Sequence, residues 1–197
     1  MATLRTSRNV SAADSGTPHL ILVGLPGSGK SRAGSAVADA LGRDFLDFDL
    51  EISRREGKSV AEIFDERGEQ HFRELERGLS EELRALGNMV LAPGGGWMSR
   101  PDAVALLRPP ARLVYLKVTP GTAVRRMGAG VGGRPLLNHP DPVSELGRLL
   151  ASRRVGYESA DFVIDVERLA PQEVANRIID WTERFSGPAG GVAPSPY

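Results

Sequence analysis

The sequence predicts a single α/β domain built on a parallel β-sheet. Its 197 residues can bury one core without disulfides or a structural metal. Five short, largely apolar runs are separated by helical patterns: HLILVG (19–24), DFLDF (44–48), NMVLA (88–92), ARLVYLKV (111–118) and DFVIDV (161–166). Runs of this kind are typical of strands covered on both faces by helices.

Helix signals fill the intervals between these runs. RAGSAVADAL follows the first run, and GEQHFRELERGLSEELRAL carries an apolar stripe at helical spacing. Further helix starts are indicated by the capping-box pair Ser59 and Glu62, by Ser99 before Pro101, by Thr119 with Pro120, and by Pro171. Residues 127–142 interrupt this rhythm with Gly and Pro; the segment is either a linker-like loop or a functional lid, and a long loop inside a compact domain favours the lid.

The two ends of the chain differ in composition from the middle. Residues 1–17 are polar without periodicity, and residues 187–197 are rich in Pro, Gly and Ser. Such segments bury too little apolar surface to order themselves. We therefore expect disordered tails on either side of one domain spanning 18–186.

Charge and cysteine content limit the classes of partner and the cellular compartment that we expect. Lys plus Arg and Asp plus Glu balance at 25 each, so we expect small-molecule partners rather than nucleic acid or a membrane surface. The absence of cysteine excludes disulfides and thiolate metal sites and fits a reducing compartment, so we expect a cytoplasmic protein. No apolar run approaches the roughly 20 residues of a membrane span.

The stretch GLPGSGKS satisfies the Walker A pattern with Gly24, Gly29, Lys30 and Ser31. Its glycines let successive N–H groups point at phosphate oxygens, Lys30 reaches the β and γ phosphates, and Ser31 ligates Mg²⁺. The alternative is a Gly-rich turn with an accidental lysine, but the flanking strand and helix favour a nucleotide site. No Asn precedes a Lys, which argues against a GTPase switch.

An acidic pair, Asp47 and Asp49, ends the second predicted strand. Strand alternation predicts that Asp47 and Asp49 point to one side while Phe48 turns away. One carboxylate would then hold the water shell of a metal and the other would orient or deprotonate a hydroxyl. The alternative is a pair of solvated acids at a strand end.

Arg73 and Glu76 lie three residues apart beside the apolar stripe of their helix. They form either a weak surface ion pair or an arginine aimed at a substrate carboxylate and held by Glu76. Similarly, the three glycines after Pro93 either permit a sharp turn or admit a ligand to bare backbone.

Cations near the predicted cleft provide candidates for charge neutralisation. Arg134 in the Gly-rich segment and Arg153 in the next helix are the favoured ones, and Arg125, Arg126 and Arg154 compete with them. A mobile arginine that closes over the γ-phosphate would neutralise charge and exclude water.

In order and spacing, GLPGSGKS, LDFD, GEQHFRELE, PGGG, RPLL and RRVGY resemble the shikimate kinase family over about residues 18–185. The resemblance implies a nucleoside-monophosphate-kinase-like three-layer fold whose five-stranded parallel sheet has the order 2-3-1-4-5. It also implies a substrate-binding segment at about 48–80, a lid at about 127–141, and a monomer. The implied reaction is the phosphorylation of the 3-hydroxyl of shikimate by ATP with Mg²⁺.

The resemblance also implies residue roles. Lys30, Asp49 and Arg134 would be catalytic. Nucleotide contacts would come from Gly27, Ser28, Gly29, Lys30, Ser31, Arg32, Arg126, Arg134 and Pro171, with Arg126 and Pro171 around the adenine. Shikimate contacts would come from Asp49, Arg73, Gly94, Gly95, Gly96 and Arg153, with Glu76 orienting Arg73, and with Phe64 and Phe72 near the ring. Ser31 would bind Mg²⁺ directly and Asp47 through water.

Two alternatives stay open at this point. A related small-molecule kinase such as gluconate kinase would share the phosphate loop, and a nucleotide-binding regulator would keep the loop but lose Lys30, Asp49 or Arg134. All three residues are present. Departures from the family pattern include Arg32 in place of the usual Thr, and a proline before the glycines.

Overall fold

The computed structural model describes residues 16–128 and 140–185. Arg134, most of the predicted lid and nearly all of both predicted tails lie outside this part of the chain. The described residues form a five-stranded parallel sheet of order β2-β3-β1-β4-β5, which confirms the predicted fold class. Its strands are β1 (Leu20–Val23), β2 (Asp44–Asp47), β3 (Met89–Ala92), β4 (Arg112–Lys117) and β5 (Phe162–Asp165).

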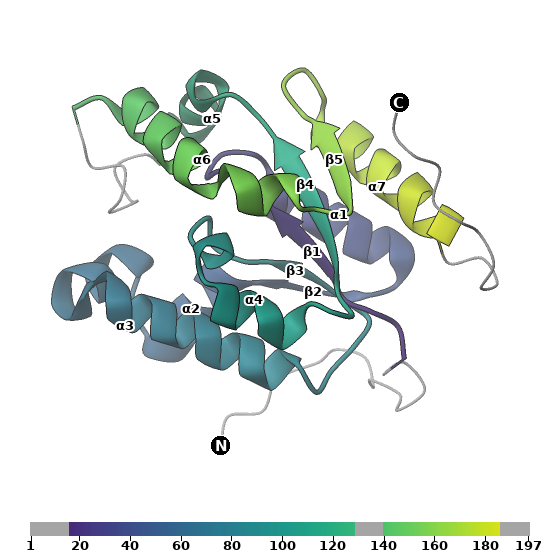
Figure 1. Ribbon diagram of the computed structural model, residues 1–197, viewed down its shortest axis with the longest axis horizontal. Coiled ribbons are helices and arrows are strands. Elements are labelled where there is room, and N and C mark those ends of the chain that lie inside the picture. Colours follow the sequence, from purple (N-terminus) through teal and green to yellow (C-terminus); the bar gives the residue numbers. More distant parts are fainter. Residues whose placement is uncertain (1–15, 129–139, 186–197) are drawn as a thin grey trace.

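Helices cover both faces of this sheet (Figure 1). They are α1 (Lys30–Leu41), α2 (Phe48–Glu56), α3 (Val60–Leu83), α4 (Pro101–Leu107), α5 (Pro120–Met127), α6 (Pro142–Glu158) and α7 (Pro171–Phe185), with a short 3₁₀ turn η2 (Trp97–Ser99) before α4. α1 packs against α7 on one face, while α3 packs against α4 on the other. The central strand β1 is buried throughout, as expected for a strand between two helical layers.

The register of the sheet brings two loops together. β1 pairs with β3, Leu20 lying opposite Val90, and with β4, Leu20 lying opposite Arg112. All the strands are parallel, so their carboxyl ends meet at one edge of the sheet. The loops that follow β1 and β3 are therefore neighbours, and this edge is where ligands bind in such folds.

Most predicted helix starts are confirmed. Ser59 and Glu62 form the capping box, since the Ser59 Oγ accepts from the Glu62 N–H and the Glu62 carboxylate accepts from the Ser59 N–H. Thr119 caps α5, and Pro171 opens α7. The helix start predicted at Pro101 is also confirmed, since α4 begins there; its N-cap is Arg100, and Ser99 ends the preceding 3₁₀ turn.

The geometry predicted for Asp47 and Asp49 was wrong. β2 ends at Asp47, and Phe48 and Asp49 already belong to α2, a helix that the sequence reasoning missed. The Asp47 Oδ1 accepts the Asp49 N–H at 3.0 Å and the Leu50 N–H at 3.3 Å, so Asp47 is the N-cap of α2. Helix geometry rather than strand alternation thus places Asp49.

A sharp irregularity divides α3 into two helical stretches. Gly68 has φ 80° and ψ 169°, which is outside the helical region and suits glycine. The sequence patterns had indicated one helix before this glycine and another starting at it. Glu69 therefore begins the second stretch, which carries Arg73 and Glu76 on its buried side.

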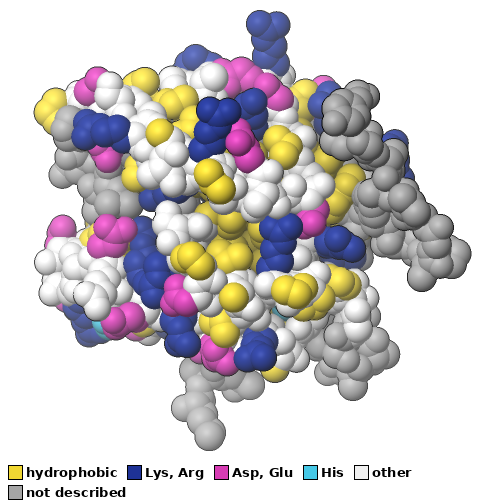
Figure 2. Space-filling model, in the orientation of Figure 1, with side chains coloured by type: hydrophobic (Ala, Val, Ile, Leu, Met, Phe, Trp, Pro, Cys, Tyr) yellow, Lys and Arg dark blue, Asp and Glu magenta, His cyan; other side chains and the backbone are white. Residues whose placement is uncertain are grey.

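The surface agrees with the balanced composition. On the face in Figure 2, Lys and Arg side chains are interspersed with Asp and Glu, and apolar side chains lie between them. Within residues 16–128 and 140–185, no helix combines the length and the apolar character needed to cross a membrane.

Candidate active site

A cavity of about 600 Å³ opens at the carboxyl edge of the sheet. It brings together three groups of predicted site residues that are far apart in sequence. Its wall includes Gly27, Ser28, Gly29, Lys30, Ser31 and Arg32 from the phosphate loop and the start of α1, Asp47, Asp49, Gly94 and Gly95 from the segments after β2 and β3, and Arg126 and Pro171 from α5 and α7. The cavity can therefore hold two ligands side by side, one at the loop and one at Asp49.

The phosphate loop is shaped by glycines that no other residue could replace without strain. Gly27 has φ 80°, and a Cβ there would lie 2.4 Å from the Ala123 carbonyl oxygen of α5. Gly29 has φ 96° and caps α1 without a side chain, and no acidic residue lies in the first turn of α1. The positive end of this helix is thus left for an anion.

Lys30 is folded back onto its own loop. Its Nζ donates to the carbonyl oxygens of Gly24 at 3.0 Å and Leu25 at 3.1 Å. These contacts hold the ammonium group beside the N-terminus of α1. A phosphate bound there would meet a cation that is already in place.

Ser31 and Asp47 form a pair of oxygen ligands beside this loop. The Ser31 Oγ donates to the Asp47 Oδ2 at 2.5 Å, while the other Asp47 oxygen caps α2. A hydroxyl and a carboxylate are the donors that Mg²⁺ prefers when it keeps several waters and binds substrate phosphates. Among the described residues no group of three or more His, Asp or Glu is arranged to hold a metal ion, so such an ion would depend on this pair and the nucleotide.

Asp49 faces a second carboxylate across Gly94. A Cβ at Gly94 would lie 2.9 Å from the Asp49 Oδ1 and 2.6 Å from the Glu76 Oε1. The Glu76 side chain is 1% exposed, and its Oε1 has no hydrogen-bond partner among the described residues. Burial raises the pKa of Glu76, and the Arg73 guanidinium opposes this shift.

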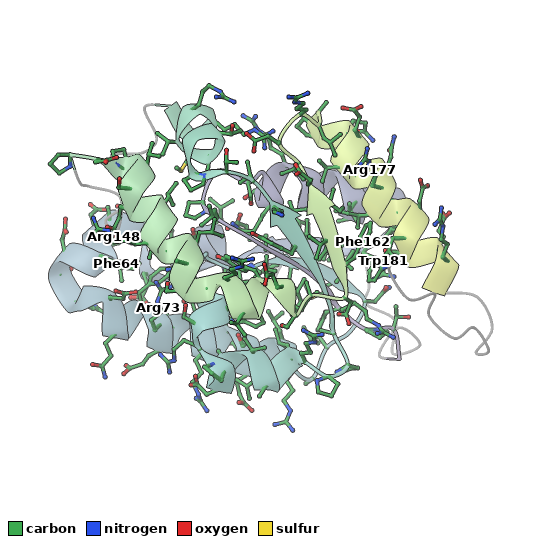
Figure 3. All side chains as sticks on the ribbon, turned by 45° about the horizontal axis from the view of Figure 1, so that its top comes forward. Phe64, Arg73, Arg148, Phe162, Arg177 and Trp181 are labelled. Carbon is green, nitrogen blue, oxygen red and sulfur yellow. The ribbon has the colours of Figure 1, made fainter. Side chains whose placement is uncertain are left out.

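Arg73 is buried, so the interpretation as a solvated surface ion pair is wrong. Its Nη1 donates to the Glu76 Oε2 at 2.7 Å, and its guanidinium lies 5.9 Å from the centre of the Phe64 ring and 5.7 Å from that of Phe72. Figure 3 shows Arg73 and Phe64 on α3. This is no solvated surface pair but a fixed cation, suited to recognising a carboxylate.

The glycine turn Gly94–Gly96 provides space rather than unusual dihedral angles, since none of the three has a positive φ. A Cβ at Gly96 would lie 2.3 Å from the Arg73 Cζ, and a Cβ at Gly95 would lie 3.2 Å from the Arg153 Nη1. Two guanidinium groups therefore lie close to this backbone. Neither is among the residues that line the cavity.

Two aromatic residues that the sequence reasoning missed hold this turn in place. The Trp97 Nε1 donates to the Ser80 Oγ at 3.0 Å, and that hydroxyl donates to the Glu76 carbonyl oxygen at 2.9 Å. The Tyr157 hydroxyl, one turn after Arg153, donates to the Gly95 carbonyl oxygen at 3.0 Å. A sequence signal existed, because Trp97 directly follows the glycines.

Arg126 lies at the other end of the cavity. Its Nη2 donates to the carbonyl oxygens of Val166 at 2.6 Å and Glu167 at 3.3 Å, beside the loop that leads to Pro171. The competing arginines are engaged elsewhere: Arg125 with Thr122 at 2.8 Å, and Arg154 with Glu158 at 2.8 Å on the surface.

Glu167 is a further residue that the sequence reasoning missed. Its carboxylate accepts the Thr119 N–H and hydroxyl, each at 2.9 Å, and the Thr122 hydroxyl. These hydrogen bonds lower the pKa of Glu167 to about 2. They join the loop after β5 to the start of α5, which carries Arg126. The available signal was an acid directly after a strand, at the edge where ligands bind.

Together these features define a P-loop kinase for a small molecule, with a phosphate loop and an acidic acceptor site in one cavity. The family model "Shikimate kinase" matches residues 26–183. The chain belongs to the shikimate kinase family and is an ATP-using kinase.

Individual relatives agree with this assignment. The shikimate kinase of Chromohalobacter salexigens is 41% identical over 174 residues, covering 88% of this chain and 96% of the relative. That of Synechococcus sp. strain RCC307 is 39% identical, covering 82% of each chain. A solved shikimate kinase from Acinetobacter baumannii in complex with shikimate superimposes with a TM-score of 0.83 at 32% identity, covering 88% of this chain and 97% of that one.

The competing kinase shares the fold alone. A gluconokinase from Sinorhizobium meliloti superimposes with a TM-score of 0.57 at 19% identity, covering 86% of this chain and 93% of that one. The comparisons therefore favour the shikimate kinase interpretation over the gluconate kinase alternative.

Proposed function

We propose that the chain transfers the γ-phosphate of ATP to the 3-hydroxyl of shikimate, giving 3-phosphoshikimate and ADP on the route to chorismate and the aromatic amino acids. The observation that carries this proposal is the single cavity in which Lys30 and Asp49 both line the wall. A donor phosphate and an acceptor hydroxyl are thereby held side by side, which is most of what phosphoryl transfer needs from a protein.

The donor half binds ATP through the phosphate loop. Lys30 and the N–H groups at the start of α1 stabilise the β and γ phosphates, and Arg32 borders the same space. Ser31 and Asp47 hold Mg²⁺, which when bound neutralises charge on the phosphates. Arg126 and Pro171 enclose the adenine.

The acceptor half binds shikimate between α2 and the glycine turn. Asp49 orients the 3-hydroxyl and takes its proton as that oxygen bonds to the γ-phosphorus and the bond to the β–γ bridging oxygen breaks. Arg73 and Arg153 bind the carboxylate, and the Gly95 backbone meets a hydroxyl. Glu76 keeps Arg73 in place through its 2.7 Å ion pair.

Three further proposals complete the description. Arg134 lies outside the described residues, and its role over the transferring phosphate stays a prediction. From the family resemblance we propose a monomer, and from the balance of 25 basic and 25 acidic residues we propose that it needs no nucleic-acid partner. The cysteine-free composition supports action in the cytoplasm.

The test is ADP release in the presence of ATP and Mg²⁺ with shikimate, quinate or gluconate as acceptor. We expect shikimate-dependent release, and its absence would overturn the proposal. Arg73→Ala should weaken shikimate binding in calorimetry by at least about tenfold, because it removes a buried charged partner. The matched control is Arg84→Ala at the exposed end of the same helix, which should bind shikimate as the wild type does.

A further inference from the structure

The Arg73 guanidinium has two carboxylate partners that differ in their access to water. Glu76 is 1% exposed and accepts from Nη1 at 2.7 Å. Glu69 is 50% exposed, and its Oε1 accepts from Nε at 3.1 Å and from Nη2 at 2.7 Å. One whole edge of the guanidinium, with two of its N–H donors, is therefore already occupied by a carboxylate that reaches solvent.

The charges around this point leave little room for another anion. Arg73 has an ion pair with each of Glu69 and Glu76, and Asp49 faces Glu76 across Gly94. Arg153 is the other buried cation of the group. An incoming carboxylate would add a fourth negative group to two positive ones, which is strongly unfavourable away from water. One carboxylate must leave the guanidinium for the new one to bind well.

Glu69 is the carboxylate that can move away from the Arg73 guanidinium. Glu76 is enclosed, so moving it would leave a buried charge without its partner. Glu69 comes directly after Gly68, whose φ of 80° and ψ of 169° interrupt the helix. Its side chain stands in the first turn of the second helical stretch, where it can rotate into water and remain close to the positive helix end.

We propose that Glu69 is a stand-in for the substrate carboxylate. In the free enzyme it holds the Nε and Nη2 edge of Arg73 in a carboxylate-binding orientation, and the substrate carboxylate displaces it on binding. One carboxylate then replaces another, so the guanidinium neither moves far nor loses a charged partner. Glu69 thereby sets how strongly an anionic acceptor must compete for Arg73.

The test is Glu69→Gln, since glutamine retains an oxygen acceptor of the same reach but competes without charge. We expect the shikimate dissociation constant to fall about threefold, the scale of a half-exposed ion pair, while the KM for ATP is unchanged. The matched control is Glu74→Gln, which makes the same charge change at an exposed position of the same helix. It should leave shikimate binding unchanged. Equal or weaker shikimate binding by Glu69→Gln would overturn the proposal.

Glu69→Asp gives a second, independent measurement. Aspartate keeps the charge but falls short of Arg73 by one methylene, so shikimate should again bind more tightly. Unchanged or weaker binding by this variant would count against the stand-in role. Thermal melts confirm that each variant is folded.

This inference rests on the proposed role of Arg73, and the two can fail separately. If Arg73→Ala binds shikimate normally, the carboxylate clamp itself is wrong. If Arg73→Ala loses affinity while Glu69→Gln gains none, the clamp stands and the stand-in role alone is refuted. In the double variant Arg73→Ala with Glu69→Gln, the gain should disappear, because the competition requires the guanidinium.

Discussion

Replacing Gly96 with alanine would place a methyl group where the Arg73 guanidinium already lies. The new Cβ would be 2.3 Å from Cζ, 2.3 Å from Nη2 and 2.6 Å from Nη1, so the guanidinium must retreat by about 1 Å to reach ordinary contact. Gly96 itself has φ −84° and ψ −13°, which alanine adopts readily. The perturbation therefore acts on Arg73 rather than on the backbone.

This retreat should damage the acceptor site selectively. Overpacking costs about 1–3 kcal/mol of stability, and a 1 Å misplacement of a binding group can lower the rate by up to about 100-fold. We expect kcat/KM for shikimate to fall by about 10- to 100-fold, with the KM for ATP within about twofold of the wild type. Coupled ADP-release kinetics at varied shikimate and at varied ATP separate the two effects.

The matched control is Gly78→Ala on α3, the helix that carries Arg73, because a Cβ at Gly78 meets nothing within 4 Å. This variant should leave kcat/KM for shikimate and the KM for ATP unchanged and should raise the free energy of unfolding by about 0.5–1 kcal/mol. If a folded Gly96→Ala enzyme uses shikimate as the wild type does, the contact between Arg73 and the glycine turn has no part in acceptor binding.

Three other predictions concern different parts of the molecule. Asp49→Asn should lower kcat by about 10²- to 10⁴-fold while calorimetry shows near-normal ATP binding, and unchanged turnover would refute its role. Glu167→Gln should raise the KM for ATP by about two- to tenfold and spare shikimate, because the carboxylate loses its charge-assisted bonds from Thr119 and Thr122; a KM for ATP like that of the wild type would contradict this. Burial lowers the pKa of His19 from 6.5, and its Nδ1 accepts the Met89 N–H, so the unfolded chain binds the extra proton more readily. The free energy of unfolding should therefore decrease as the pH falls below about 6.5, and urea titrations of His19→Gln should show a flatter pH dependence.

The elements that the sequence predicted best are those with strong local signals. The five apolar runs correspond to the five strands within one residue at each end. The Walker A pattern located the phosphate loop, because its chemistry depends on consecutive residues. The parallel arrangement followed from burial on both faces, whereas the strand order came only from the family resemblance.

Asp47 and Asp49 show why local periodicity can mislead. The prediction carried the strand through Asp49, two residues beyond the end of β2, although Asp47 followed by Asp49 and Glu51 also fits a helix N-cap with acids in its first turn. A short strand and a helix start compete over the same residues. The choice depends on the packing of Phe48, which is fully buried and lies edge-on to Trp97, almost 50 residues away.

The environment of Arg73 could not be predicted from spacing. Residues three apart on a helix interact whether they lie on the surface or in the core. Burial of the pair comes from the glycine turn, which is distant in sequence, so only the folded chain distinguishes the two cases. The same holds for Glu69, whose contact with Arg73 looks like an ordinary surface pair until the second partner is seen.

The pairing of β1 with β3 has a consequence for how acceptor preference can change. Adjacent strands lie about 4.8 Å apart, so the distance between phosphate loop and glycine turn is a property of the sheet. Nearly all the proposed acceptor groups, from Asp49 to Gly96, come from one continuous stretch, and Arg153 alone comes from elsewhere. Residues 47–97 together with Arg153 therefore form a natural unit for transplantation into another kinase of this strand order. A chimera that gains shikimate-dependent ADP release only when Arg153 accompanies the segment would demonstrate such modularity.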